Sequence, residues 1–391
     1  MNLTNQGTIK GKIGIENKNG GFTGTITVRT FDNKKTIDGH IYMGIWQGNG
    51  TINIETFNNE GTISGVSRKE KGVHFEAQNS AKVHINTFRN SGSIEGHGED
   101  SSKNQPRQGV YFQGNVTINT FENEGTITSE KGQGVYFEGN VHVGTFHNTG
   151  TGFITGYGEN SQAGGLMTGG GVVMSGGTIE TFKNSGTITS NTEDSQHYPA
   201  GVKLDYATVK TFENTGLISG PFGFITTQGT IETFINRGII ESKGKSHDGK
   251  EAAIRIQTAM SSVSTINHLI NEGTIKSDSH NGILIESGNK IGTIINKGTI
   301  ETKSNGISFF DYGPEGSPGE ADLGKIILES GSSIKAQKNG INIDNKAVRT
   351  LRADGIEVQK GASVSGDEAG IYLAKTDEIT APITISGTVS G

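Results

Sequence analysis

Apolar and polar residues alternate with a period of two along most of this chain. Segments such as Val116-Thr117-Ile118 and Gly109-Val110-Tyr111-Phe112 place an apolar side chain at every second position. That spacing is typical of β-strands that bury one face. No stretch of useful length repeats its apolar residues every 3.6 positions, as an amphipathic helix does. The pattern therefore predicts an all-β protein built from short strands.

These strands belong to an internal repeat. Its core, T-F-x-N-x-G-[TS]-I, is clearest between Ile118 and Ile127, and other copies begin at Thr56, Thr87 and Thr181. Looser copies begin at Thr211, Thr233, His268 and Thr293. Successive repeat Asn residues are 22 to 36 positions apart. This period is too short for a four-stranded propeller blade and fits one turn of a three-sided coil.

Each repeat contains three extended pieces, namely Val-x-Ile, Phe-x-Asn-x-Gly-x-Ile and Gly-[VI]-x-apolar. Stacked coils of this kind predict a right-handed parallel β-helix, or β-solenoid, with three strands per coil and roughly 12–14 coils. The repeat positions then form internal ladders, of which the best members are Phe57, Phe88, Phe121 and Phe182, and Asn59, Asn90, Asn123 and Asn184. Each Asn amide is expected to bond to the amides above and below it. The Gly two residues later is expected to permit a tight bend or a positive φ.

The regularity of the repeat divides the chain into three parts. Residues 1–310 carry regular repeats, 311–322 form a separate insert, and 323–391 form less regular coils. In this last part Ile327 and Glu329, and then Glu357 and Gln359, are expected at the Phe and Asn positions. Linkers of variable length follow the G-T-I strand, at Gly96–Gln108, Gly156–Gly170, Asn191–Pro199 and Ser242–Glu251. Inserts at one corner of a solenoid are the usual place for binding loops.

Composition narrows the classes of function. The 61 Gly residues follow the repeat and therefore indicate turns rather than disorder. The absence of Cys excludes a disulfide framework, a Cys-based zinc site and a thiol nucleophile. A net charge of −6 argues against a nucleic-acid partner, which needs a basic face. The ten His residues are scattered, so we expect solvated side chains and no metal site or cofactor.

Two fragments resemble polygalacturonase-type hydrolases, a class that includes parallel β-helices. These are Gly96-His97-Gly98, and Arg255-Ile256-Gln257 in place of Arg-Ile-Lys. The adjacent Asp pair of that class is absent, and Asn191-Thr192-Glu193 stands in place of its Asn-Thr-Asp. The calcium-binding Asp cluster of lyases with this fold is absent as well. We therefore expect a protein that is not an enzyme, and we rank a polysaccharide hydrolase or lyase third among the possible functions.

One surface feature is expected to bind a partner. The outward position of the third strand holds Tyr42, His74, Tyr111 and Tyr136 in consecutive coils. Stacked about 4.8 Å apart, these rings would form a strip along the helix. The strip has two interpretations, a ladder that stabilises the sheet or an exposed platform for a glycan or protein. We predict an exposed strip and therefore a binding site.

The Gly/Asn/Thr-rich coils, the N-x-G-T-I units, the absence of Cys and the mild acidity resemble autotransporter passengers of the type V secretion class. The similarity covers nearly the whole chain and is greatest to adhesin-like and vacuolating-cytotoxin-like passengers. It implies a surface-exposed or secreted protein of a Gram-negative bacterium, excised from a longer chain with a C-terminal outer-membrane β-barrel. An adhesin that binds a host-cell protein or glycan, or that self-associates, is the first functional hypothesis, and a toxin segment acting on host cells is the second.

Overall fold

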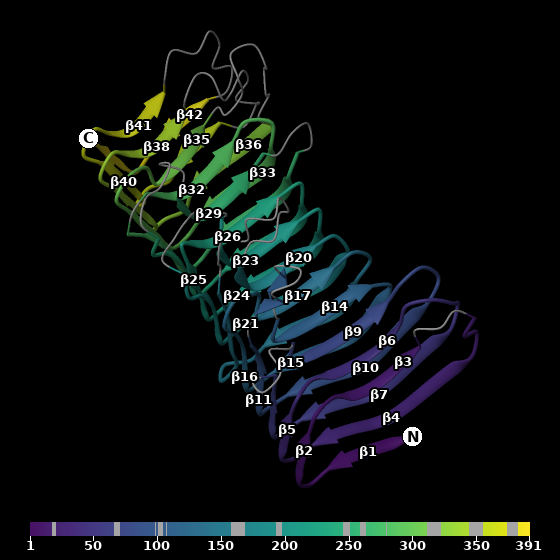
Figure 1. Ribbon diagram of the computed structural model, residues 1–391. Coiled ribbons are helices and arrows are strands. Elements are labelled where there is room, and N and C mark those ends of the chain that lie inside the picture. Colours follow the sequence, from purple (N-terminus) through teal and green to yellow (C-terminus); the bar gives the residue numbers. More distant parts are fainter. Residues whose placement is uncertain are drawn as a thin grey trace. The chain divides into compact units, whose positions relative to one another are not determined.

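The computed structural model describes residues 1–17, 21–65, 71–97, 99–100, 105–106, 108–157, 169–192, 198–244, 251–258, 263–278, 280–310, 322–343, 355–373 and 382–391. Over these residues the chain forms β-strands joined by turns, without helices. Three parallel sheets, called A, B and C here, contain 14, 14 and 13 strands. The chain visits them in the order A, B, C in every coil, which makes the fold a right-handed parallel β-helix with three strands per coil (Figure 1).

Sheet A consists of β1 (Asn2–Asn5), β4 (Thr25–Asn33), β7 (Thr51–Asn59), β10 (Lys82–Asn90), β15 (Val116–Asn123), β18 (His142–Asn148), β21 (Thr178–Asn184), β24 (Thr208–Asn214), β27 (Thr230–Asn236), β30 (Thr265–Asn271), β33 (Lys290–Asn296), β36 (Asp322–Leu328), β39 (Ile356–Val358) and β42 (Ile383–Ile385). Sheet B consists of β2 (Thr8–Lys10), β5 (Thr36–Asp38), β8 (Thr62–Ser64), β11 (Ser93–Gly96), β16 (Thr126–Ser129), β19 (Phe153–Gly156), β22 (Thr187–Ser190), β25 (Leu217–Gly220), β28 (Ile239–Ser242), β31 (Thr274–Ser277), β34 (Thr299–Thr302), β37 (Ser333–Ala336), β40 (Ser363–Gly366) and β43 (Thr388–Ser390).

Sheet C consists of β3 (Ile13–Asn17), β6 (Ile41–Ile45), β9 (Val73–Ala77), β14 (Val110–Gly114), β17 (Val135–Glu138), β20 (Gly170–Ser175), β23 (Ala200–Asp205), β26 (Phe222–Thr227), β29 (Ala252–Gln257), β32 (Asn281–Glu286), β35 (Ile307–Phe310), β38 (Asn339–Ile343) and β41 (Ala369–Leu373). The short antiparallel pair β12 (Glu99–Asp100) and β13 (Gln105–Pro106) lies within the first predicted insert. The rest of that insert's interior, most of the other three corner inserts and residues 311–321 lie outside the described residues, so the predicted three-part division stays a prediction.

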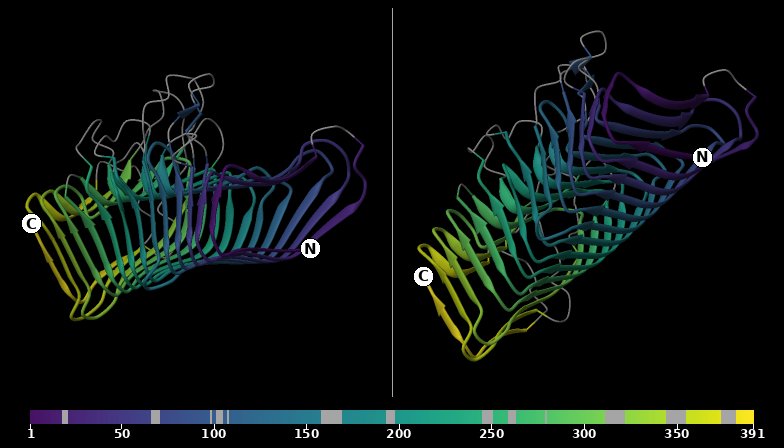
Figure 2. Two further views of the ribbon diagram at one scale, coloured as in Figure 1. Left: turned by 60° about the horizontal axis from the view of Figure 1, so that its bottom comes forward. Right: turned by 90° about the horizontal axis from the view of Figure 1, so that it is seen from below.

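The chain forms two compact units. The first includes Met1–Thr192 and continues to Thr208, and the second runs from Val209 to Gly391. Figure 2 shows the strands of the three sheets side by side in each unit. Each unit repeats the same order of strands, so one coil describes the construction of both.

Two stacks of phenyl rings fill the core of the first unit. Phe121 of sheet A lies between Phe88 and Phe146, with ring centroids 4.8 Å apart on each side. The edges of Phe112 and Phe137, from sheet C, meet its ring at centroid distances of 6.1 and 6.3 Å. All five side chains are buried, as the repeat predicts for the Phe position held by Phe88, Phe121 and Phe146. Stacked and edge-to-face rings both contribute beyond their buried area.

A ladder of buried amides lies at the corner between sheets A and B. Asn123 accepts a hydrogen bond at Oδ1 from Asn90 Nδ2, and donates from its own Nδ2 to Asn148 Oδ1, both at 2.8 Å. It also donates to the backbone oxygen of Gly125 at 3.0 Å. The ladder therefore satisfies a polar group that would otherwise be costly to bury. Gly125 is needed for close approach rather than for a positive φ, because a Cβ there would lie 2.1 Å from the backbone oxygen of Gly92.

The strand boundaries differ from the sequence prediction. The Val-x-Ile and Phe-x-Asn pieces belong to one strand, such as β15, and the break follows Asn123. The alternation slips inside this strand, because Asn119 and Thr120 both point outward between the buried Ile118 and Phe121. Two outward residues in succession change the phase without ending the strand, and a period-two reading divides the strand at that point.

The amide ladder ends inside the second unit. The residues that continue its Phe and Asn positions each lie one residue before the predicted ones. β36 places Ile326 and Leu328 opposite Ile294 and Asn296, and both are buried. The next coil continues with Ile356 and Val358. The prediction that Ile327 and Glu329, and then Glu357 and Gln359, take these positions is therefore wrong. Ile326 and Ile327 are both apolar, so the sequence alone fits either register.

Candidate functional site

The four rings of the predicted strip lie on sheet C and are buried. Tyr42, His74, Tyr111 and Tyr136 expose only 6, 8, 6 and 6% of their surface. They follow one another in the predicted order, with centroid distances of 5.1, 4.5 and 5.2 Å between successive rings. Tyr42 meets His74 edge to face, and the other two pairs are stacked. The expectation that this strip faces solvent is wrong. The stacking distances agree with the other interpretation, a ladder that stabilises the sheet.

Sheet C is covered on both faces along most of its strands, which is the physical reason for this correction. In β17 the consecutive residues Val135, Tyr136 and Phe137 are all buried, although their side chains alternate between the two faces. β20 carries Val172, Val173 and Met174 at consecutive positions, and these are buried too. Strands buried on both faces read as continuous apolar runs. These runs in the sequence indicate that both faces of sheet C are covered.

A buried carboxylate, Glu76, organises the N-terminal part of the ring ladder. Its Oε2 accepts hydrogen bonds from the Tyr42 hydroxyl at 2.9 Å and from the Trp46 indole Nε1 at 2.6 Å. Gln78 donates to its other oxygen. Burial, and then the negative charge of Glu76, raise the pKa of Tyr42 far above its usual value, so this phenol remains a donor. Glu76 thereby fixes the ring of Trp46, which is 48% exposed and was missed by the sequence reasoning.

His74 is held neutral in the same ladder. Burial lowers its pKa well below the usual value, and the positive charge of Lys71 lowers it further. Its Nε2 lies 3.8 Å from Glu76 Oε2. By contrast, His84, His142 and His268 are exposed, as expected for solvated positions.

The neighbouring coils use a second carboxylate. The Tyr111 hydroxyl donates to Glu138, and Gln113 Nε2 donates to the same carboxylate oxygen at 3.2 Å. Burial, followed by the charge of Glu138, raises the pKa of Tyr111 and of Tyr136 far above the usual range. These phenols therefore stay protonated at every physiological pH.

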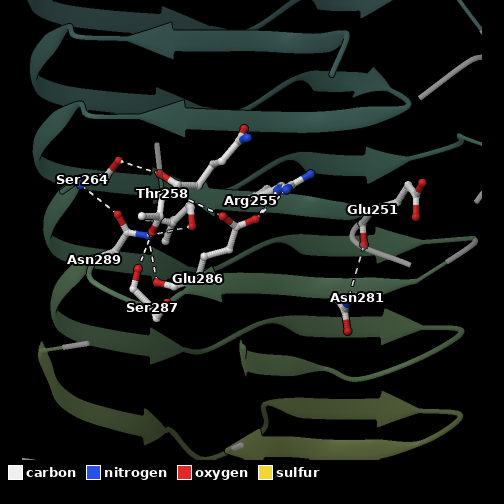
Figure 3. Close-up of polar contacts among 10 residues, drawn as sticks. Glu251, Arg255, Thr258, Ser264, Asn281, Glu286, Ser287 and Asn289 are labelled. Atoms are coloured by element: carbon white, nitrogen blue, oxygen red, sulfur yellow. Dashed lines mark hydrogen bonds and ion pairs between the residues drawn. The ribbon is translucent and has the colours of Figure 1, made fainter. Parts of the chain in front are cut away.

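In the second unit the same outward position of sheet C holds a buried ion pair (Figure 3). Arg255, on β29, donates from Nε and Nη2 to Oε1 of Glu286, on β32, at 2.8 and 2.5 Å. The backbone amide of Thr258 donates to Glu286 Oε2 at 2.9 Å. Ile225 and Leu284 occupy the Arg255 position in the coils on either side and are also buried. The carboxylate therefore accepts hydrogen bonds from a guanidinium and a backbone amide, and the guanidinium lies between two apolar side chains.

Asn289 ties successive coils together beside this pair (Figure 3). Its Nδ2 donates to the backbone oxygen of Ile256 at 3.0 Å and to Thr258 Oγ1 at 2.9 Å. Its Oδ1 accepts a hydrogen bond from the backbone amide of Ser264 at 2.8 Å. This buried amide does for the corner between sheets C and A what the Asn ladder does for the corner between A and B. It was not found from the sequence, because it lies outside the repeat motif.

The two hydrolase-like fragments lie in different units. His97 Nδ1 lies 2.9 Å from Glu130 Oε1 and its Nε2 lies 3.2 Å from Glu95 Oε2, while Gly98 lies outside the described residues. Arg255 is engaged by Glu286, as described above. In the part of the chain that is described, no group of three or more His, Asp and Glu side chains is arranged to hold a metal ion.

An open, polar groove of about 580 Å³ lies along the outer face of sheet B in the second unit. Its walls carry Lys276 and Lys335, which lie 3.2 and 3.9 Å from Asp278 and Glu301. Lys303 also lines it. The groove alternates charges of both signs and has no aromatic wall, so nothing in it selects one class of ligand.

Comparison with known proteins gives no relative. No family model, no curated protein and no solved structure matches the chain. Within the described ranges there is no helix long and apolar enough to cross a membrane.

Proposed function

We propose that this chain is a non-enzymatic autotransporter passenger, exposed on the surface of a Gram-negative bacterium or secreted from it, that acts as an adhesin. The observation that carries the proposal is the construction from stacked coils, each held by its neighbours through the Phe and Asn ladders. Such a solenoid grows in one dimension and presents long outer faces to partners. The resemblance of its repeats to adhesin-like passengers supports the same function.

The chemistry of the buried charges supports a structural rather than a catalytic role. Glu76 accepts hydrogen bonds from Tyr42 and Trp46, and Glu286 accepts them from Arg255 and Thr258. Carboxylates used in this way fix neighbouring side chains. The partners that we propose are a protein or glycan of a host-cell surface, or a second copy of this chain.

The proposal is tested by the binding of fluorescently labelled, purified chain to cultured epithelial cells. We expect saturable binding that an excess of unlabelled chain displaces, or concentration-dependent self-association in sedimentation. The thermally unfolded chain is the control for non-specific adsorption. A folded chain that neither binds cells saturably nor self-associates would contradict the proposal.

A further inference from the structure

Two exposed aromatic side chains lie at one corner of the first unit. Trp46 follows β6 and Tyr206 follows β23, so both lie where the chain passes from sheet C to sheet A. They expose 48 and 57% of their surface. This corner, here called the C–A edge, runs along β6, β9, β14, β17, β20 and β23, which are successive neighbours in sheet C (Figure 1).

Amide side chains line the C–A edge between the two rings. Asn79 donates to the backbone oxygen of Trp46 at 3.0 Å, and Asn115 donates to the backbone oxygen of Asn79 at 2.6 Å. Asn140 continues the series by donating to Asn115 Oδ1 at 3.1 Å. Asn79 and Asn140 are exposed. Each amide has two donor hydrogens and two acceptor lone pairs, which is more than these contacts use.

Trp46 presents its ring in a fixed orientation. Its indole nitrogen donates to the buried Glu76 carboxylate, and its backbone amide donates to the carbonyl of Asn17 at 3.1 Å. The polar end of the side chain is therefore anchored while the ring remains accessible. A rigid ring loses little conformational entropy when a ligand stacks on it.

Tyr206 occupies a backbone position that glycine holds in the three preceding coils, and Gln228, which follows β26 in the next coil, has a similar φ of 56°. The register pairs Ser175 with Asp205, so Tyr206 follows Gly114, Gly139 and Gly176 in one column. Those glycines have φ of 80, 81 and 87°, and Tyr206 has φ of 53°. A bulky residue in this left-handed region is strained, and strain of this kind gathers at functional sites. The fold explains the positive φ but does not explain why a tyrosine stands there.

We infer that the C–A edge of the first unit binds a linear, neutral, β-linked glycan, with Trp46 and Tyr206 stacking on sugar rings and the Asn amides bonding to their polar groups. This inference rests on the proposed function as an adhesin and names its class of ligand.

The chemistry and the spacing of the C–A edge fit this ligand. A β-linked pyranose has an apolar face of C–H groups that stacks on an aromatic ring and an equatorial rim of hydroxyl groups that bond to amides. The edge between the rings carries three amides and one exposed cation, Lys82, which lies opposite Asn115. The amides outnumber the charge, which favours a neutral sugar. Trp46 and Tyr206 are five coil steps apart, or roughly 24 Å at about 4.8 Å per step. One pyranose advances a β-linked chain by about one such step, so a linear oligosaccharide stays in register with the amides.

The test uses the single tryptophan of the chain, whose fluorescence reports directly on this edge. The purified chain is titrated with the β-1,4-linked hexasaccharide and disaccharide of N-acetylglucosamine, and with the glucose hexasaccharide. We expect a saturable change in emission with at least one hexasaccharide and weaker binding of the disaccharide. A response to both hexasaccharides assigns recognition to the sugar rings, and a response to the acetylated one alone assigns it to the acetamido groups as well.

Two variants replace the aromatic residues by those of neighbouring coils. Tyr206→Gly supplies the residue of the preceding coils and should keep or raise stability, while it weakens hexasaccharide binding about fivefold or more. Trp46→Gln introduces the residue that the next coil has at the same position, Gln78. This variant has no tryptophan, so its hexasaccharide binding is measured by calorimetry. Tyr372→Ala removes an exposed tyrosine of the second unit and should leave binding unchanged.

The inference is overturned if neither hexasaccharide binds the folded wild-type chain, or if Tyr206→Gly and Trp46→Gln both bind as the wild type does. Saturable binding to cells that survives both substitutions would overturn this inference and leave the proposed function standing.

Discussion

At the scale of single residues, the amide ladder is the device that sets one coil on the next. Asn123 both accepts from Asn90 and donates to Asn148, so it is an interior member. Asn296 is the last member, because the next coil presents Leu328. The sequence predicted the ladder from its motif, since a repeated Asn beside a turn has few other ways to satisfy a buried amide.

This difference predicts unequal effects of one substitution. Asn123→Leu leaves the buried Oδ1 of Asn148 without its donor, whereas Asn296→Leu removes no donor from a following amide. We expect Asn123→Leu to lower the free energy of unfolding by about 1–3 kcal/mol more than Asn296→Leu, the cost of one unsatisfied buried group. Urea unfolding of the unit that carries each substitution measures this. Equal losses of unfolding free energy would show that the hydrogen bond from Asn123 to Asn148 adds nothing to the stability of the ladder.

His74 makes the stability of the first unit depend on pH. Its pKa is lowered in the folded state, chiefly by burial. Below about pH 6.5 the unfolded chain therefore binds a proton that the folded chain does not, and stability falls as the pH falls. We expect His74→Tyr, which supplies the residue of Tyr42 and Tyr111 in the adjacent coils, to reduce the loss of stability between pH 7 and pH 5. Parallel pH profiles for the two proteins would contradict a neutral, buried His74.

At the scale of the elements, sheet C is where reasoning from the sequence was least complete. Period-two alternation placed Tyr111 on one face of the sheet and Val110 and Phe112 on the other. It could not show whether each face is covered by other residues. That depends on contacts far away in the sequence. The consecutive apolar residues of β20 indicate a strand buried on both faces, because such strands have continuous apolar runs in place of alternation.

The Arg255–Glu286 pair gives a prediction for this sheet. Arg255→Leu matches the apolar neighbours Ile225 and Leu284 but leaves the Glu286 carboxylate buried without its cation. We expect it to cost about 3–5 kcal/mol, measured by urea unfolding of the second unit. The double variant Arg255→Leu/Glu286→Gln removes both charges and should recover most of this loss. A double variant as unstable as the single one would show that the guanidinium contributes packing rather than charge.

At the scale of the whole molecule, the fold class was predictable because the repeat fixes both the period and the direction of pairing. The function was less predictable, because the binding that we propose depends on residues that depart from the repeat. Trp46 stands in no repeat position, and Tyr206 replaces the glycine of the preceding coils. The motif search therefore selected the regular column of rings, which is buried, and passed over the irregular aromatic residues at the C–A edge.

One coil is the structural unit of this protein. Residues 115–139 form one complete coil, and Gly114 and Gly139 stand opposite each other with nearly equal φ of 80 and 81°. Joining Gly114 to Asn140 should therefore bring Phe88 against Phe146 and Asn90 against Asn148.

The most direct measurement is urea unfolding followed by circular dichroism of two deletion variants. The variant that lacks residues 115–139 should keep the β-sheet spectrum and unfold cooperatively at a somewhat lower urea concentration, because only one nearest-neighbour interface is lost. The variant that lacks 115–127 joins a sheet C strand to the middle of a sheet B strand and should not fold. Loss of the β-sheet spectrum in the whole-coil deletion, or equal behaviour of the two variants, would show that one coil is not the structural unit.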